Sequence, residues 1–350
     1  MGQTSASRTS VPPEPLIARY RGLICDLDGV VYRGASAVPG SVETLNHLIA
    51  DDTGVVFATN NASRPPDAVG EHLRELGLAR RGWSVVTSSQ AAAAYLADRL
   101  PTRTPVFAVG GPGVAQALAE VGLVPVGVRE LAETHVTAVV QGLGVDVSWR
   151  ELAEVAHLAE AGATWVATNL DLMLPTARGP VPGNGALVAA VQTATTVTPH
   201  VVGKPGAALL DLARRQLGTD CAQTVVCGDR LDTDIAGANA AGVDSLFVLS
   251  GASRLRDLVL APPVARPTYV AADLTGLLEP AIRLEPVPDD LVEYAPDGVP
   301  HLHGDADRAR LLRSVVTTAW AAADAGRVVC GDAQLWLRLE ERLGLVPVQA

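Results

Sequence analysis

The stretch LICDLDGVVY, residues 23–32, is an apolar run that ends in two aspartates, Asp26 and Asp28, directly before Gly29. Side chains two positions apart on a strand point the same way, so the two carboxylates are expected to share one face. In an open α/β sheet, ligands bind beyond the carboxyl ends of the strands. Two acids in that place can hold a divalent cation and divide the roles of nucleophile and proton donor.

Length and composition indicate a globular protein with more than one domain. At 350 residues the chain is too long for one small core, and we expect two domains and an appendage. A hydrophobic fraction of 48% with 19% charged residues is unlike that of a disordered chain. The net charge of −11 argues against a nucleic-acid or membrane-surface partner, because both require basic patches. The four cysteines form no CxxC pair, so neither a zinc site nor a disulfide framework is predicted.

The N-terminal segment is polar, and residues 1–16 are predicted to be disordered. It lacks the apolar core of a signal peptide. No apolar run in the sequence approaches the roughly 18 residues that a membrane span requires. We therefore expect a cytoplasmic protein.

Short apolar runs alternate with helical patterns, which is typical of βαβ units and a parallel sheet. The sequence predicts a Rossmann-like α/β core over residues 17–87 and 196–284. A second α/β set, residues 88–195, separates these segments and is interpreted as an inserted cap domain. Residues 285–350 are expected to form a small α+β appendage, with a Pro/Gly-rich linker, a hairpin and two helices. The expected strands lie at residues 23–25, 55–58, 85–86, 104–109, 137–140, 164–167, 201–202, 224–227, 245–249 and 268–270.

Two further segments place polar groups after apolar runs. In VVFATNNASR, Thr59 and Asn60 follow a predicted strand, where a hydroxyl and nearby backbone N–H groups can hold phosphate oxygens. A polar turn that caps the next helix is the alternative there. In VVGKPG, Lys204 would neutralise a bound anion as a point charge, and a solvated lysine at a helix entry is the alternative.

The segment TVVCGDRLDTDIAGA supplies more acids. Asp229 ends a predicted strand in the same way as Asp26. Asp232 and Asp234 stand where the chain enters a helix, and either of them alone could be an N-terminal cap. A hard cation bound by oxygens of Asp26 and Asp229, waters and a phosphate would have the chemistry of Mg²⁺.

Together, DLDGVVY, ATNN, GKP and GDRLDTD resemble the motifs of the haloacid dehalogenase (HAD)-type phosphatases, over about residues 18–283. The place of the inserted block is similar to that in subfamily IIA, which has a large α/β cap. The resemblance implies that Asp26 is the nucleophile that forms an aspartyl-phosphate, and that Asp28 is the general acid and base. It also implies a set of binding groups: Mg²⁺ at the Asp26 carboxylate, the Asp28 carbonyl and Asp229, supported by Asp234, and the phosphoryl group at Thr59, Asn60 and Lys204.

One cap segment, ATNLDLMLPTARGPVPGNGAL, corresponds by its order along the chain to the loop that family caps lower over the active site. The resemblance makes four of its residues candidates for substrate specificity: Asp171, Leu174, Arg178 and Asn184. The alternative for each is a Pro/Gly-rich surface turn. A closing cap implies a small organic phosphate as the substrate.

Within this family the sequence also resembles bacterial glycerol 3-phosphate phosphatases, some of which carry an acetyltransferase-like C-terminal piece. This similarity implies a Mg²⁺-dependent phosphatase for glycerol 3-phosphate, a homodimer, and an acetyltransferase-like identity for the appendage. Acetyl transfer itself is not expected, because the run that binds acetyl-CoA is absent. The enzymatic alternatives are phosphatases for phosphoglycolate, a sugar phosphate or pyridoxal phosphate. The non-enzymatic alternatives are a phospho-aspartate switch and a scaffold.

Overall fold

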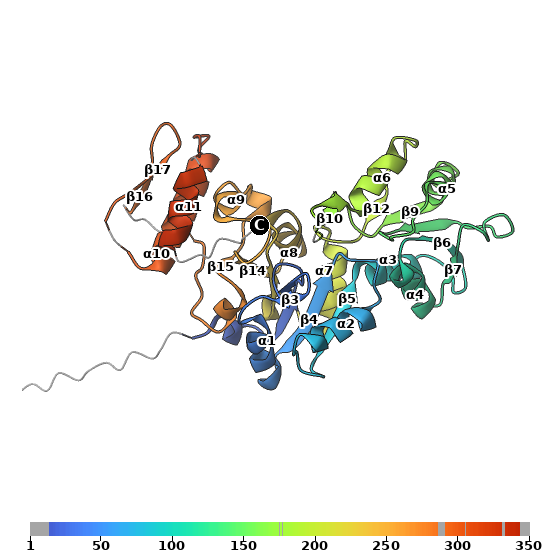
Figure 1. The fold of residues 1–350 in the computed structure, drawn as a ribbon, viewed down its shortest axis with the longest axis horizontal. Helices are drawn as coiled ribbons and strands as arrows, with labels where there is room; N and C mark the ends of the chain where they lie inside the picture. The colour runs from blue at the N-terminus through green and yellow to red at the C-terminus, as the bar shows by residue number, and fades with distance from the viewer. Residues whose placement is uncertain are drawn as a thin grey trace, which may run out of the picture.

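A computed structural model describes residues 14–174, 176, 178–285, 291–304, 306–330 and 333–343. Its first sheet is six-stranded and parallel, with the order β15-β14-β13-β1-β4-β5 (Figure 1). This sheet confirms the predicted Rossmann-like α/β core. Its strands are β1 (Gly22–Cys25), β4 (Gly54–Thr59), β5 (Trp83–Thr87), β13 (Thr224–Gly228), β14 (Asp244–Val248) and β15 (Tyr269–Ala271).

Helices cover both faces of this sheet, because alternate strand residues point to opposite sides. Leu23 and Cys25 pack in one cluster with the helices α1 (Ser41–Ala50) and α2 (Pro66–Glu75). Ile24, between them, packs in another cluster with residues of three helices on the other face. These three helices are α3 (Ser88–Ala97), α7 (Ala207–Leu217) and α8 (Ala236–Ala241).

Local signals set the limits of several helices. The Thr87 side chain caps α3 in a reciprocal pair with Gln90, which satisfies two N–H groups that have no partner within the helix. Gly242, which follows α8, has φ 66° and ends the helix in the left-handed region that glycine tolerates. A π-helical turn, Leu231–Ile235, precedes α8. The remaining short elements are η1 (Leu16–Arg19), η2 (Cys221–Gln223), α9 (Leu255–Val259), η4 (Pro263–Ala265), η5 (Leu274–Leu277) and the hairpin β2 (Tyr32–Arg33) and β3 (Ser36–Ala37).

The second sheet is five-stranded and parallel, with the order β12-β9-β8-β6-β7. Its edge strand β12 (His200–Val201) replaces the strand predicted at residues 201–202. That strand belongs to the segment assigned to the core, but it pairs with β9 of the second sheet because the chain leaves this sheet only after Val201. The other elements are β6 (Pro105–Val109), β7 (Val124–Val126), β8 (Ala138–Gln141), β9 (Thr164–Ala167), α4 (Pro112–Glu120), α5 (Trp149–Glu160), α6 (Asn184–Gln192) and the hairpin β10 (Met173–Leu174) and β11 (Val181–Pro182).

The predicted disorder of residues 1–16 is untested over most of its length and wrong at Leu16. Residues 1–13 lie outside the described residues. Leu16, placed in the disordered segment by sequence, is instead buried in the core and donates its backbone N–H to the Glu279 carbonyl at 2.8 Å. Its apolar side chain fills the cluster beside α1, which outweighs the entropy of ordering this part of the chain. No helix among the described residues combines the length and the apolar character needed to cross a bilayer.

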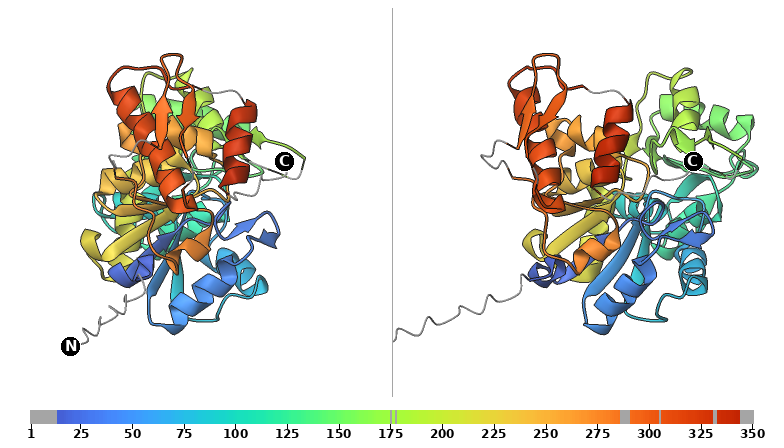
Figure 2. Two further views of the ribbon diagram at one scale, coloured as in Figure 1. Left: turned by 90° about the vertical axis from the view of Figure 1, so that its left-hand side faces the viewer. Right: turned by 60° about the vertical axis from the view of Figure 1, so that its left-hand side comes forward.

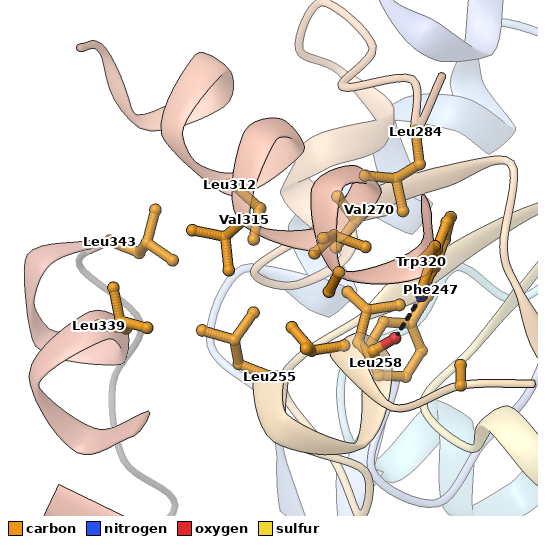
Figure 3. Packing of buried hydrophobic residues seen from close by; sticks show 14 of the residues in the cluster. Phe247, Leu255, Leu258, Val270, Leu284, Leu312, Val315, Trp320, Leu339 and Leu343 are labelled. Atoms are coloured by element: carbon orange, nitrogen blue, oxygen red, sulfur yellow. Dashed lines mark hydrogen bonds between the residues drawn. The ribbon is translucent and has the colours of Figure 1, made fainter. Parts of the chain in front are cut away.

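The C-terminal appendage has the predicted hairpin and two helices. The strands β16 (Val292–Tyr294) and β17 (Pro300–Leu302) pair antiparallel, and α10 (Arg308–Asp324) and α11 (Ala333–Arg342) follow. The appendage lies beside α9, away from the second sheet (Figures 1 and 2). Leucines and valines of α10 and α11 share one cluster with Phe247 of β14 and Leu258 of α9 (Figure 3).

Trp320 of α10 joins the appendage to the core. Its ring is buried, and its Nε1–H donates to the Leu258 carbonyl at 2.9 Å (Figure 3). The Arg266 guanidinium lies 5.0 Å from the ring centroid and makes two hydrogen bonds, of 2.6 and 2.7 Å, with Asp324 at the end of the same helix. Trp320 therefore combines buried apolar area with a satisfied polar group.

We expect Trp320→Ala to lower the free energy of unfolding by about 3–5 kcal/mol, because it empties a site shared by the appendage and the core. Urea denaturation of this variant and of Arg308→Ala, an exposed position on the same helix, provides the measurement and its control. A loss below about 1 kcal/mol for Trp320→Ala would show that the appendage does not share in the core's stability.

Candidate active site

Three neighbouring strands bring the predicted site residues to one edge of the first sheet. β1 lies between β13 and β4, and all three are parallel. Asp26 follows β1, Asp229 follows β13, and Thr59 is the last residue of β4. The acids and the hydroxyl therefore lie together at the carboxyl ends of the strands, where ligands bind in open α/β sheets.

Lys204 is a buried cation in the middle of this group. Its side chain is 4% exposed, and its Nζ contacts Asp26, lies 2.7 Å from Asp234 Oδ1 and donates to the Ala58 carbonyl at 2.9 Å. Burial alone lowers the pKa of Lys204, but Asp234 and Asp26 raise it above its ordinary value. The lysine therefore stays charged, and the alternative of a solvated lysine at a helix entry is excluded.

Three carboxylates surround a place that fits a divalent cation. One oxygen each from Asp26, Asp229 and Asp234 lies within 4.8 Å of the others. Asp229 Oδ2 accepts the Ala252 N–H at 2.5 Å, whereas its Oδ1 is buried and has no hydrogen-bond partner in the described part of the chain. Burial raises the pKa of Asp229 to about 7, with Asp234 adding to the shift. A cation would supply both the missing charge and the missing partner of Oδ1.

Backbone segments approach Asp229 so closely that only glycine fits beside it. A Cβ atom at Gly29 would lie 2.3 Å from Asp229 Oδ2, and one at Gly251 would lie 1.8 Å from the same atom. Gly29 also has φ 83°, which side chains rarely tolerate. The Ser250 hydroxyl donates to the Gly29 carbonyl at 2.8 Å and ties these two loops together. Gly29, the turn glycine that follows Asp28, is thus required for close packing against Asp229.

Asp28 lies at the exposed side of the site and not in the acid cluster. It forms an isolated bridge with Tyr32, whose ring contacts His72 edge-on at 4.9 Å between centroids. Partial desolvation raises the pKa of Asp28, while Lys204 and Arg64 oppose the rise. A raised pKa favours the protonated carboxyl group, which is the form that can donate a proton.

Asn60 has a different role from the one its motif suggests. Its Oδ1 accepts the backbone N–H of Lys204 at 2.8 Å, and its Nδ2 donates to the Lys204 carbonyl at 3.0 Å and to Asp171 Oδ2 at 3.1 Å. The side-chain amide is therefore occupied by protein groups. Thr59, also buried, accepts the Asn61 N–H at its hydroxyl oxygen, 3.1 Å away, and keeps its own proton for another acceptor.

Of the four cap candidates, the structure brings Asp171 to the site. Its Oδ1 lies 2.8 Å from Nη1 of Arg230, which directly follows Asp229. Leu174 on β10 and Arg178 in the next turn are exposed and make no described contact with the acids.

Asn184 is buried at the start of α6, beside the second sheet. Its Nδ2 donates to the carbonyls of Asn169, at 2.9 Å, and Gln141, at 3.3 Å. The amide nitrogen thus satisfies backbone groups beside β8 and β9, while the buried Oδ1 has no hydrogen-bond partner among the described residues.

Sequence reasoning missed two residues that touch the site. Arg230 binds Asp171, which follows strand β9 of the second sheet, and also Asp232, each at 2.8 Å. Asn169 donates to the Asn60 carbonyl at 2.7 Å. Each stood within a segment already singled out, but an arginine between acids and an asparagine in a turn are common on surfaces, so the sequence offered no reason to select them.

The comparisons with known proteins agree with this geometry. Residues 23–124 match the family model of haloacid dehalogenase-like hydrolases, and residues 201–277 match a second HAD-like hydrolase model. Neither model extends over the appendage, so its acetyltransferase-like identity stays a prediction. The D-glycerol 3-phosphate phosphatase of Mycobacterium tuberculosis is 42% identical over 326 residues, which cover 89% of this chain and 90% of that protein. The acid sugar phosphatase of Staphylococcus aureus is 34% identical over 256 residues, which cover 73% of this chain and 96% of that protein.

Solved structures show the same relationship. The crystal structure of the glycerol phosphate phosphatase from Mycobacterium tuberculosis in complex with magnesium has a TM-score of 0.83 and 40% identity, and the match covers 95% of this chain and 100% of that one. The p-nitrophenyl phosphatase from Archaeoglobus fulgidus has a TM-score of 0.68 and 28% identity, with 74% and 98% of the two chains covered. The chain therefore belongs to the haloacid dehalogenase-like hydrolases.

Proposed function

We propose that this protein is a Mg²⁺-dependent phosphatase that hydrolyses glycerol 3-phosphate to glycerol and phosphate. The observation that carries the proposal is the buried Lys204, placed between Asp26 and Asp234, together with Asp229 Oδ1, which has no hydrogen-bond partner in the part of the chain that the structure describes. One cation is already fixed there, and the acids still fit a second. A dianionic phosphoryl group placed between two such charges would be stabilised as it is transferred.

Asp26 is proposed as the nucleophile. Its carboxylate attacks phosphorus and forms an aspartyl-phosphate as the bond to the leaving oxygen breaks. Asp28 gives its proton to that oxygen, so the alcohol leaves neutral. Asp28 then takes a proton from a water molecule, which attacks phosphorus and releases phosphate from Asp26.

The remaining groups bind and orient. Lys204 and the Thr59 hydroxyl are proposed to hold oxygens of the phosphoryl group. The Asp26 carboxylate, the Asp28 carbonyl and Asp229 would hold Mg²⁺, with Asp234 aligning Lys204 beside them. The bound ion would supply positive charge to the phosphoryl oxygens. The Asn60 side chain is assigned to positioning Lys204, because both its oxygen and its nitrogen bind the Lys204 backbone.

Glycerol 3-phosphate is proposed as the substrate because the relative named for it matches this chain over 89% of its length. The acid sugar phosphatase, at 34% identity over 73% of the chain, makes a sugar phosphate the second candidate. Phosphoglycolate and pyridoxal phosphate remain family alternatives. A phospho-aspartate switch or a scaffold is less favoured, because Asp28 stands beside the nucleophile with a raised pKa that suits proton transfer.

The organisation around the site is part of the proposal. The predicted limits, 17–87 and 196–284 for the core, 88–195 for the cap and 285–350 for the appendage, are kept with three changes. Leu16 and helix α3 are assigned to the core, and strand β12 is assigned to the cap. A cytoplasmic homodimer is the proposed form, and a small phosphorylated metabolite is the proposed partner. The net charge of −11 supports the exclusion of nucleic acids and anionic membrane surfaces as partners.

We expect Asp26→Asn to lower phosphate release by at least about a thousandfold, because the amide cannot form the aspartyl-phosphate. The measurement is release of inorganic phosphate with Mg²⁺ from glycerol 3-phosphate, a hexose phosphate, phosphoglycolate and pyridoxal phosphate. Asp211→Asn, a partly exposed position on α7 that pairs with Arg214, is the control outside the acid cluster and should keep the activity. Faster hydrolysis of another ester would overturn the proposal that glycerol 3-phosphate is the substrate. Hydrolysis of none of these esters would favour the phospho-aspartate switch or the scaffold.

We expect Asp229→Asn to raise the Mg²⁺ concentration that half-saturates the protein by about 10- to 100-fold, because an anionic ligand becomes a neutral one. The rise in melting temperature on titration with Mg²⁺ reports this binding without substrate. Asp211→Asn again serves as the control. An unchanged Mg²⁺ titration in Asp229→Asn would place the ion elsewhere.

A further inference from the structure

We infer that Asp171, carried by the cap, is a positioning residue that aligns Lys204 through Asn60 when the cap rests on the core. The inference rests on the proposed function for its catalytic consequence, but not for its geometry. Asp171 lies two hydrogen bonds from the Lys204 backbone and one ion pair from the segment that carries Asp229. Among the described residues, it is the one carboxylate of the cap that contacts both Asn60, which follows β4, and Arg230, which follows β13.

The cap holds Asp171 firmly. Its backbone N–H donates to Asn169 Oδ1 at 3.1 Å, and its carbonyl accepts the Gly185 N–H at 2.9 Å. A Cβ atom at Gly183 would lie 2.2 Å from that same carbonyl oxygen, so the β10–β11 hairpin can close against Asp171 only with glycine there. A side chain fixed this way can transmit the position of the cap.

Asn60 receives this constraint and passes it to Lys204. An amide NH₂ group has two protons, and in Asn60 one goes to the Lys204 carbonyl and the other to Asp171. The amide oxygen accepts the Lys204 N–H at 2.8 Å. Asn60 therefore holds the Lys204 backbone at two points, and its own orientation is fully satisfied only while Asp171 is in place.

Arg230 provides the second anchor for Asp171. Its Nε and Nη2 bind Asp232, at 3.1 and 2.8 Å, which leaves Nη1 directed to Asp171 at 2.8 Å. Its backbone N–H donates to Asp234 Oδ2 at 3.1 Å. Because Asp234 also binds the Lys204 ammonium, the cap carboxylate is connected to the lysine along two independent routes.

Other contacts keep the cap docked when Asp171 is removed. Asn169 donates to the Asn60 carbonyl at 2.7 Å, and the backbone N–H of Gly113, in the first turn of α4, donates to the Ser63 carbonyl at 3.3 Å. A truncation at Asp171 thus loosens the alignment of Lys204 without detaching the cap. This separates a positioning role from a role in holding the two domains together.

Hydrogen exchange tests the geometry without substrate. We expect Asp171→Ala to speed exchange of the Lys204 backbone N–H several-fold, because the amide that accepts it loses an anchor. Amides of the cap strand β8 should exchange as in the unaltered protein, and Asp146→Ala, an exposed cap position, should change neither. Unchanged exchange at Lys204 would overturn the inference, and a rise through β8 as well would mean a folding defect instead.

Kinetics tests the consequence. We expect Asp171→Ala and Arg230→Gln each to lower kcat about tenfold with a change in KM below about twofold, because a misplaced lysine weakens stabilisation of the transition state. The double variant should lose little more than either single variant, since the pair acts as a unit. A raised KM at constant kcat would overturn the inference and make Asp171 a substrate contact. An inactive unaltered protein with Lys204 exchange still dependent on Asp171 would refute the proposed function alone.

Discussion

The buried ammonium group of Lys204 constrains the rest of the site. A charge taken out of water is tolerated only beside compensating groups, and here these are Asp26, Asp234 and the Ala58 carbonyl. These groups come from three separate segments, so the ends of β1, β4 and β13 must lie side by side for the lysine to be buried at all. The parallel sheet supplies this arrangement. A shift in the register of these strands would separate Lys204 from the carboxylates that compensate its charge.

The single lysine does not balance the charge of the carboxylates around it, and this leaves the site suited to bind a cation. Three acids surround one lysine, and burial raises the pKa of Asp26 well above its usual value although Lys204 lies against it. Asp229 Oδ1 has no partner in the described residues, and glycines at positions 29 and 251 allow the backbone to close around the same carboxylate. A site with excess negative charge and an enclosed oxygen selects a small hard cation. A cation and the lysine together can then accept a dianion.

The sequence predicted the strand-end acids because period-two strands and their order determine where such residues gather. Asp26 and Asp229 follow apolar runs, so their positions could be derived from local pattern. Lys204 follows a strand of the second sheet, and its place in the site was expected from the resemblance of the GKP motif. Asn60 and Asn184 could not be assigned in this way, because an amide binds either backbone or ligand according to neighbours that are distant in sequence. Strand β12 was assigned to the wrong sheet for a similar reason, since two residues carry no signal of their pairing partner.

The appendage packs against the turn Leu231–Ile235, which carries Asp234 of the candidate active site. Leu231 and Ile235 belong to the same buried cluster as Trp320 and the leucines of α11, while Asp234, between them, faces Lys204. The π-helical turn at Leu231–Ile235 lets neighbouring residues face opposite directions, one set toward the apolar cluster and Asp234 toward the lysine. Packing of the appendage against Leu231 and Ile235 therefore holds in place the turn that carries Asp234. The π-helical turn Leu231–Ile235 therefore contributes both to the apolar cluster of the appendage and to the position of Asp234.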